Sequence, residues 1–150
     1  VDGEPCPCGR NGCFEAYCSA TALVRMTRKA ISENPDSGLE KAALDEGRIS
    51  GRTAFSAMRQ GDELGKSLVE TYIKYLAAGI ANVINVFQPD ILAIGGGVSN
   101  EGEALLTPLK EQVARQIYTK NLEKNTEIVT CHLANHAGII GAALLGISHE

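Results

Sequence analysis

The stretch Cys6-Pro7-Cys8-Gly9-Arg10-Asn11-Gly12-Cys13-Phe14-Glu15 places three thiols within eight residues. Gly9 and Gly12 allow the chain to turn back, so that Cys13 can face the same point as Cys6 and Cys8. Three converging thiolates supply three of the four ligands of a tetrahedral zinc ion, and this stretch contains no fourth. The sequence therefore predicts a metal site at these cysteines, with three metal-free thiols as the alternative.

Glu15 follows the last of these cysteines by two residues and begins a segment with helical spacing. If the cysteine turn ends directly in a helix, a carboxylate in the first helical turn is held in one place and can accept hydrogen bonds from a polar ligand. The alternative is a carboxylate that simply interacts well with a helix N-terminus. The residue pattern leaves both interpretations open.

The composition restricts the class of protein. With 150 residues and 44% hydrophobic content, the chain is long and apolar enough for one globular domain with a real core. The net charge of −4, without a basic run, gives no indication of nucleic-acid contact. Five unevenly spaced cysteines favour a metal site in a reducing cytosol over a disulfide framework. No segment is typical of a membrane span or signal peptide, so a cytoplasmic location is predicted.

Apolar periodicity predicts four helices in the first part of the chain, over residues 15–34, 39–44, 51–60 and 62–87. Ser50 and Asp62 are the expected N-caps of the last two. The apolar stripe of the longest helix continues along its whole length, which is typical of a largely buried helix. Gly79 in its interior lowers helix stability, which indicates close packing there unless the glycine is merely tolerated.

The second part of the chain reads as alternating strands and helices. Residues 91–94 are wholly apolar, as in a strand covered on both faces, and three glycines follow at once. Asn100 and Glu103 resemble a capping box for a helix that extends to residue 117, with Thr107 and Pro108 as a possible second start. A second strand over 127–133 and a helix of small residues over 137–146 complete the prediction.

The turn Gly95-Gly96-Gly97 between a strand and a helix start leaves backbone amides that can face a bound anion or nucleotide. It matches neither the dinucleotide fingerprint nor the P-loop. From these residues alone, a nucleotide site and a plain strand–helix turn both remain open.

Taken together, the motifs resemble the ROK family, which comprises repressors, open reading frames and sugar kinases. The resemblance covers nearly the whole chain, and its cysteine pattern is the most specific part. It rests on Cys6-Pro-Cys8-Gly9-x-x-Gly12-Cys13-Phe-Glu15-Ala-Tyr-x-Ser19, Gln60-Gly61-Asp62, Asn85-x-Phe87-x-Pro89-Asp90, Gly95-Gly96-Gly97-Val98-Ser99 and Ala137-Gly138-x-x-Gly141-Ala142-Ala143.

The resemblance implies an α/β fold, the C-terminal lobe of an actin-like and hexokinase-like (ribonuclease H-like) ATPase, helix-rich because the opening strand meander precedes residue 1. Residues 1–150 would form one lobe, with a zinc knuckle over 6–15, a helical region over 15–88 and a nucleotide region over 91–147. The N-terminal lobe would be absent, because the chain begins without Met in what reads as a loop. An open sheet edge and an uncovered face then predict a homodimer or higher oligomer.

For function, the resemblance implies an ATP-dependent hexose kinase most like the glucokinases. Zinc at Cys6, Cys8 and Cys13 would be structural, and Glu15 would contact the sugar. ATP, carried with magnesium, would place its adenosine at Gly95, Gly96, Gly97 and Val98. The catalytic Asp and a His that completes the zinc site would both precede residue 1, so the isolated chain is expected to be inactive. The alternatives are a sugar-sensing repressor half and a zinc-stapled dimerisation module without catalysis.

Overall fold

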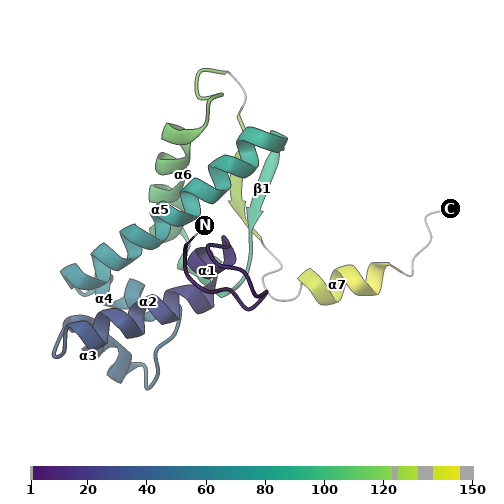
Figure 1. Ribbon diagram of the computed structural model, residues 1–150. Helices are drawn as coiled ribbons and strands as arrows, with labels where there is room; N and C mark the ends of the chain where they lie inside the picture. Colours follow the sequence, from purple (N-terminus) through teal and green to yellow (C-terminus); the bar gives the residue numbers. More distant parts are fainter. Residues whose placement is uncertain (1, 123–124, 132–136, 146–150) are drawn as a thin grey trace.

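The computed structural model describes residues 2–122, 125–131 and 137–145, and Figure 1 shows the path of the chain. Its elements are, in order, α1 (Glu15–Cys18), α2 (Ala20–Glu33), α3 (Gly38–Asp45), α4 (Thr53–Arg59), α5 (Glu63–Phe87), β1 (Ile91–Ile94), the 3₁₀ helix η1 (Gly97–Glu101), α6 (Glu103–Gln116), β2 (Glu127–Thr130) and α7 (Ala137–Leu144). This helix-rich α/β arrangement confirms the predicted class. Within the described ranges, none of the helices combines the length and apolar character needed to cross a membrane.

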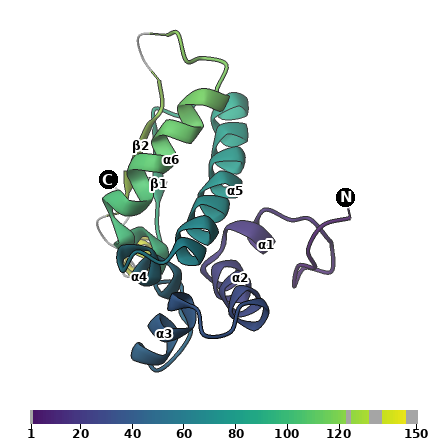
Figure 2. The ribbon, with the colours of Figure 1, turned by 90° about the vertical axis from the view of Figure 1, so that its left-hand side faces the viewer.

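The long helix α5 organises the core. Asp62 caps it as predicted, because its carboxylate accepts a hydrogen bond of 2.7 Å from the backbone N–H of Gly65. α4 and α6 pack against it, and Figure 2 shows α5 and α6 lying side by side. The buried positions of α5 follow helical spacing and include Leu68, Val69, Tyr72, Ile73, Leu76, Ala77, Ile80, Ala81 and Ile84. Burial ends at the last turn, where Val86 and Phe87 are exposed.

Helix boundaries are where the sequence prediction was wrong. The single helix expected over 15–34 is two helices, because Ser19 adopts an extended backbone (φ −81°, ψ 162°) and its hydroxyl accepts from the N–H of Ala22 at 3.0 Å. Ser19 is therefore an N-cap inside the apolar pattern. Ser50 does not cap α4 directly. Its hydroxyl accepts from the N–H of Arg52, and the helix begins only at Thr53.

The start of α6 also differs from the prediction. Gly102, with φ +58°, occupies the N-cap position and offers no side chain, so Asn100 and Glu103 do not form a capping box. The residues before it form η1 instead. Pro108 lies inside a continuous α6 rather than at a second start, and the hydroxyl of Thr107 donates to the Glu103 carboxylate at 2.7 Å.

β1 and β2 form a parallel pair in which Ile91 is opposite Glu127 and Ile94 is opposite Thr130. α6 provides the crossover that parallel strands require. The expectation that β1 is covered on both faces is wrong for this chain, because burial alternates along the strand and Ile91 is 60% exposed. The predicted second strand is observed as far as Thr130, and residues 132 and 133 lie outside the described residues.

Candidate functional site

The cysteine stretch, residues 6–15, folds into a compact knuckle that Glu4 helps to close. The N–H of Cys6 donates to the carbonyl of Arg10 at 2.9 Å, and the N–H of Gly12 donates to that of Glu4 at 2.9 Å. Gly9 and Gly12 have φ values of +85° and +74°, a region that favours glycine, so both turns occur where the sequence placed them.

The knuckle brings three sulfur atoms together. The Sγ atoms of Cys6, Cys8 and Cys13 all lie within 4.8 Å of one another, and those of Cys8 and Cys13 are 3.6 Å apart. Zinc at about 2.3 Å from each sulfur in tetrahedral geometry would hold them about 3.8 Å apart. The donor set and its spacing therefore fit zinc, with three ligands from this group.

The electrostatic environment separates the thiol of Cys8 from that of Cys18. The backbone N–H of Arg10, followed by its guanidinium, lowers the pKa of Cys8 to about 7 by hydrogen bonding to the thiolate. The hydrogen bond to Cys8 is the main reason that the pKa of Cys13 is raised. Burial, and to a smaller extent the charge of Glu15, raises the pKa of Cys18 to about 12. Cys18 is thus a protonated, partly buried thiol rather than a ligand.

Aromatic and ionic contacts fix the knuckle to α2 and α5. The hydroxyl of Tyr17 accepts from the N–H of Glu4 at 2.7 Å, and the Tyr17 ring lies 4.8 Å from that of Tyr75. The guanidinium of Arg25 donates to the carbonyl of Ala16 at 2.8 Å and lies 3.6 Å from the Glu4 carboxylate. These contacts hold the backbone on both sides of Glu15.

Glu15 is the first residue of α1, as the sequence predicted, and it is exposed to solvent. Its carboxylate is therefore accessible to a ligand on a backbone that the knuckle constrains. Its role as a sugar contact stays a prediction.

The triple-glycine turn leaves its backbone accessible. Gly96 has a φ of +83°, and a Cβ placed on Gly96 or Gly97 would meet no atom within 4 Å. Ser99 closes the turn by donating to the carbonyl of Gly96 at 2.7 Å. Val98 is 8% exposed, so its side chain packs inward and only its backbone can contribute to a binding surface.

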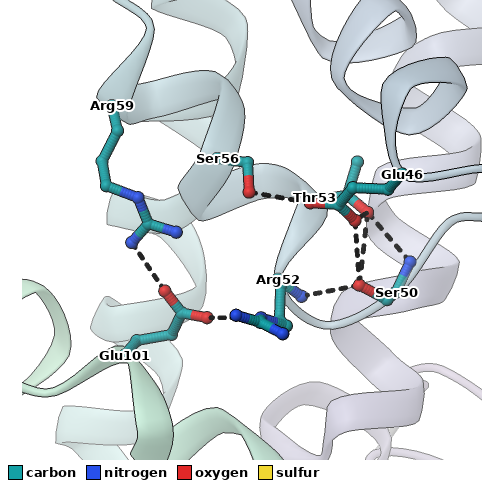
Figure 3. Close-up of polar contacts among 7 residues, drawn as sticks. All are labelled: Glu46, Ser50, Arg52, Thr53, Ser56, Arg59 and Glu101. Carbon is teal, nitrogen blue, oxygen red and sulfur yellow. Dashed lines mark hydrogen bonds and ion pairs between the residues drawn. The ribbon is translucent and has the colours of Figure 1, made fainter.

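A polar cluster next to this turn was missed by the sequence prediction (Figure 3). The Glu46 carboxylate accepts from the hydroxyls of Ser50 (3.1 Å), Thr53 (2.7 Å) and Ser56 (2.7 Å). These hydrogen bonds lower the pKa of Glu46 in spite of the opposing effect of partial burial.

A second carboxylate, this one buried, belongs to the same cluster. The side chain of Glu101 is 4% exposed and lies 2.7 Å from Nη1 of Arg59 and 4.0 Å from Nε of Arg52. Glu101 ends η1, whereas both arginines belong to the α4 region, so this pairing crosses a long stretch of sequence. No motif or periodicity indicates it.

Comparison with known proteins shows the class of proteins that this chain resembles. A glucokinase of Thermotoga maritima is 37% identical over 142 residues, which is 95% of this chain and 44% of that protein. A crystal structure of a ROK family glucokinase from Streptomyces griseus in complex with glucose and AMPPNP matches with a TM-score of 0.81 and 31% identity, over 96% of this chain and 47% of that one. A ROK family transcriptional regulator, a homologue of the E. coli MLC protein, matches with a TM-score of 0.73 and 28% identity, over 96% and 35% respectively.

These matches place the chain among proteins that include sugar kinases and transcriptional regulators. The family model described as "ROK family" matches residues 1–148, and the chain belongs to the ROK family. The resemblance inferred from the cysteine and glycine motifs is thereby confirmed. The chain spans about half the length of the relatives it matches.

Proposed function

We propose that this chain is the C-terminal half of an ATP-dependent sugar kinase of the glucokinase type, which phosphorylates a hexose hydroxyl. The observation that carries the proposal is the match of 96% of the chain, at a TM-score of 0.81, to a glucokinase in complex with glucose and AMPPNP. The identity of 37% to a second glucokinase supports it. A cytoplasmic location and a homodimer or higher oligomer form part of the same proposal.

Each part of the lobe has a role in this proposal. Cys6, Cys8 and Cys13 in the knuckle (6–15) would hold a structural zinc ion, which stabilises the loop that carries Glu15. The Glu15 carboxylate would accept hydrogen bonds from sugar hydroxyls. The helical region (15–88) supports both.

In the nucleotide region (91–147), the backbone of Gly95, Gly96, Gly97 and Val98 would lie against the adenosine of ATP, which arrives with magnesium. The general base is expected to be an Asp outside these 150 residues, so the chain alone is proposed to be inactive.

The sugar role of Glu15 is tested by phosphoryl transfer from ATP to glucose, measured with the whole polypeptide. Glu15→Gln should raise the KM for glucose about tenfold, because a neutral amide is a weaker acceptor than a carboxylate. Glu63→Gln is the matched control, since Glu63 is also an exposed carboxylate in the first turn of a helix. An unchanged KM in Glu15→Gln would contradict the assignment.

The similarity to a transcriptional regulator supports a second candidate, a sugar-sensing repressor half. Such a protein would bind the sugar without phosphorylating it. A third candidate is a zinc-stapled dimerisation module, which would bind neither sugar nor nucleotide. The open space over Gly96 and Gly97 favours the kinase, because a nucleotide can approach the backbone closely there. Calorimetric titration with glucose and with AMPPNP distinguishes the three.

A further inference from the structure

The sulfur atoms of the knuckle are placed to react with one another as well as to bind a metal ion. The Sγ atoms of Cys8 and Cys13 lie 3.6 Å apart, within hydrogen-bonding distance, and that of Cys6 lies within 4.8 Å of both. A disulfide bond holds its two sulfur atoms at about 2 Å, so Cys8 and Cys13 need only a small side-chain movement to form one. Cys18 and Cys131 do not belong to this cluster.

Backbone hydrogen bonds hold the loop that carries these thiols in a closed form. Pro5 and Asn11 pair across it in an antiparallel bridge, and the N–H of Gly9 donates to the carbonyl of Cys6 at 3.0 Å. Such bonds are made by the polypeptide itself, so they keep the sulfur atoms near one another independently of a metal ion. A disulfide between residues 8 and 13 therefore needs no refolding of the chain.

The exposure of the two thiols gives them different roles. Cys8 is exposed to solvent, whereas Cys13 is half-buried. An oxidant that arrives from solvent therefore meets Cys8 first, and Cys13 is the neighbouring thiol that can resolve the oxidised sulfur. An accessible cysteine beside a resolving one is typical of redox-sensitive sites. Disulfides of this kind are transient in a reducing cytosol, which suits the cytoplasmic location proposed above.

We propose that Cys8 and Cys13 form a reversible disulfide bond when the knuckle meets hydrogen peroxide, with Cys8 as the attacking thiol and Cys13 as the resolving thiol. The sulfur of Cys8 attacks one peroxide oxygen, the O–O bond breaks, and Cys8 becomes a sulfenic acid as one water molecule leaves. The sulfur of Cys13 then attacks that of Cys8, the S–O bond breaks, and a second water molecule leaves. The two thiols lose two electrons and two protons, and the peroxide takes up both.

This disulfide and the proposed metal site exclude each other. The bond uses two of the three sulfur donors and leaves Cys6 as the only thiolate, which is too few for a zinc site of the structural type. Oxidation would therefore remove metal from the segment that carries Glu15, and a thiol reductant would restore the donor set. The proposal itself rests on the sulfur positions, and it depends neither on the zinc assignment nor on the kinase function.

Peptide mapping tests the proposal, because trypsin cleaves after Arg10 and thus between the two cysteines. It yields the peptides 1–10 and 11–25, each of which contains two cysteines. The reduced chain is freed of metal with a chelator, treated with hydrogen peroxide, blocked with N-ethylmaleimide and digested without reductant. Mass spectrometry should find the two peptides cross-linked in protein that is monomeric on a non-reducing gel, and dithiothreitol should separate them.

Single serine variants identify the two sulfur atoms. Cys8→Ser and Cys13→Ser should each lower the yield of the cross-link about tenfold, because the nearest sulfur partner is lost. Cys6→Ser and Cys18→Ser are the matched controls, since each removes the other cysteine of one tryptic peptide, and both should keep the cross-link. Circular dichroism checks that each variant is folded.

The wild-type chain decides the proposal even where a variant fails to fold. A wild type without the cross-link, or with it only between two chains, would overturn the proposal, as would an unchanged yield in folded Cys8→Ser. A wild type that binds no zinc but forms the cross-link would remove the metal assignment and support the disulfide, so the two failures can be told apart.

Discussion

The ring of Phe14 occupies the space in which a side chain on Gly79 would stand. Phe14 lies between Cys13 and Glu15, and Gly79 lies in the middle of α5. The cysteine knuckle therefore docks on the organising helix at Gly79, one of the two glycines of that helix. The close packing that the sequence predicted at Gly79 is confirmed, and its partner is the candidate metal site.

This contact predicts an unusual result for Gly79→Ala. In an exposed helix interior, alanine is more favourable than glycine by about 1 kcal/mol. Here the new methyl group overlaps an aromatic ring, and overpacking costs about 1–3 kcal/mol, so the free energy of unfolding should fall. Thermal denaturation followed by circular dichroism measures it. In a Phe14→Ala background the same substitution should be neutral or stabilising, and a fall of equal size in both backgrounds would contradict the contact.

Zinc content tests the donor set directly. The purified chain should contain zinc by atomic absorption, and Cys8→Ser should lower the content strongly, because a serine hydroxyl replaces a thiolate ligand. Cys131→Ser is the control, since Cys131 lies beside Gly95 and outside the sulfur cluster. Equal and near-zero zinc in wild type and Cys8→Ser would remove the metal assignment.

The lowered pKa of Cys8 predicts when this thiol reacts. Because its pKa is about 7, the thiolate prevails above pH 7, and alkylation of chelator-treated protein by iodoacetamide should slow as the pH falls through that value. Cys18, with a pKa of about 12, should stay protonated and unmodified over the same range.

Peptide mass spectrometry assigns the modified residue. Arg10→Ala should shift the midpoint of Cys8 upward, towards the ordinary thiol value of about 8.5, because the guanidinium contribution is lost. A midpoint that does not move would show that the guanidinium contributes nothing to the lowered pKa.

Glu46→Ala should destabilise the start of α4. It removes the acceptor of three hydroxyl hydrogen bonds, one of them from the buried Thr53, and the expected loss is about 1–2 kcal/mol in the free energy of unfolding at neutral pH. The folded-state pKa of Glu46 is lowered, so this contribution is present above the unfolded-state pKa and disappears as the pH falls through the folded-state value.

Urea denaturation at neutral and acidic pH measures the change. Glu111→Ala, which removes an exposed carboxylate 4.0 Å from Arg115, should cost at most about 0.5 kcal/mol. An equal cost for Glu46→Ala and Glu111→Ala would show that the hydroxyl network adds nothing to stability.

The apolar surface at the end of α5 predicts self-association. Val86, Phe87 and Ile91 are 72%, 74% and 60% exposed, and they lie close to one another in the sequence. Light scattering should show a mass above that of the monomer, and Phe87→Ser should lower it. Leu44→Ser is the control, because Leu44 is 75% exposed but stands on α3. A monomeric wild type at every concentration would contradict this prediction.

The sequence by itself determined the features that arise from neighbouring residues. The sulfur cluster needs eight consecutive residues and two glycines with positive φ, and it formed where the motif placed it. The Asp62 cap and the path of α5 likewise follow from local hydrogen bonding and periodicity. The family was identifiable for the same reason, since its motifs are short and contiguous.

The tertiary structure alone decided what depends on residues far apart in the chain. The ring of Phe14 packs against Gly79, and the carboxylate of Glu101 pairs with Arg59, and no local pattern encodes either contact. The exposed face of β1 has the same origin, because an apolar strand specifies that it can be covered but not what covers it. Neighbouring residues determine the backbone conformation of a helix or turn, whereas the contacts between such elements are determined only when the whole chain has folded.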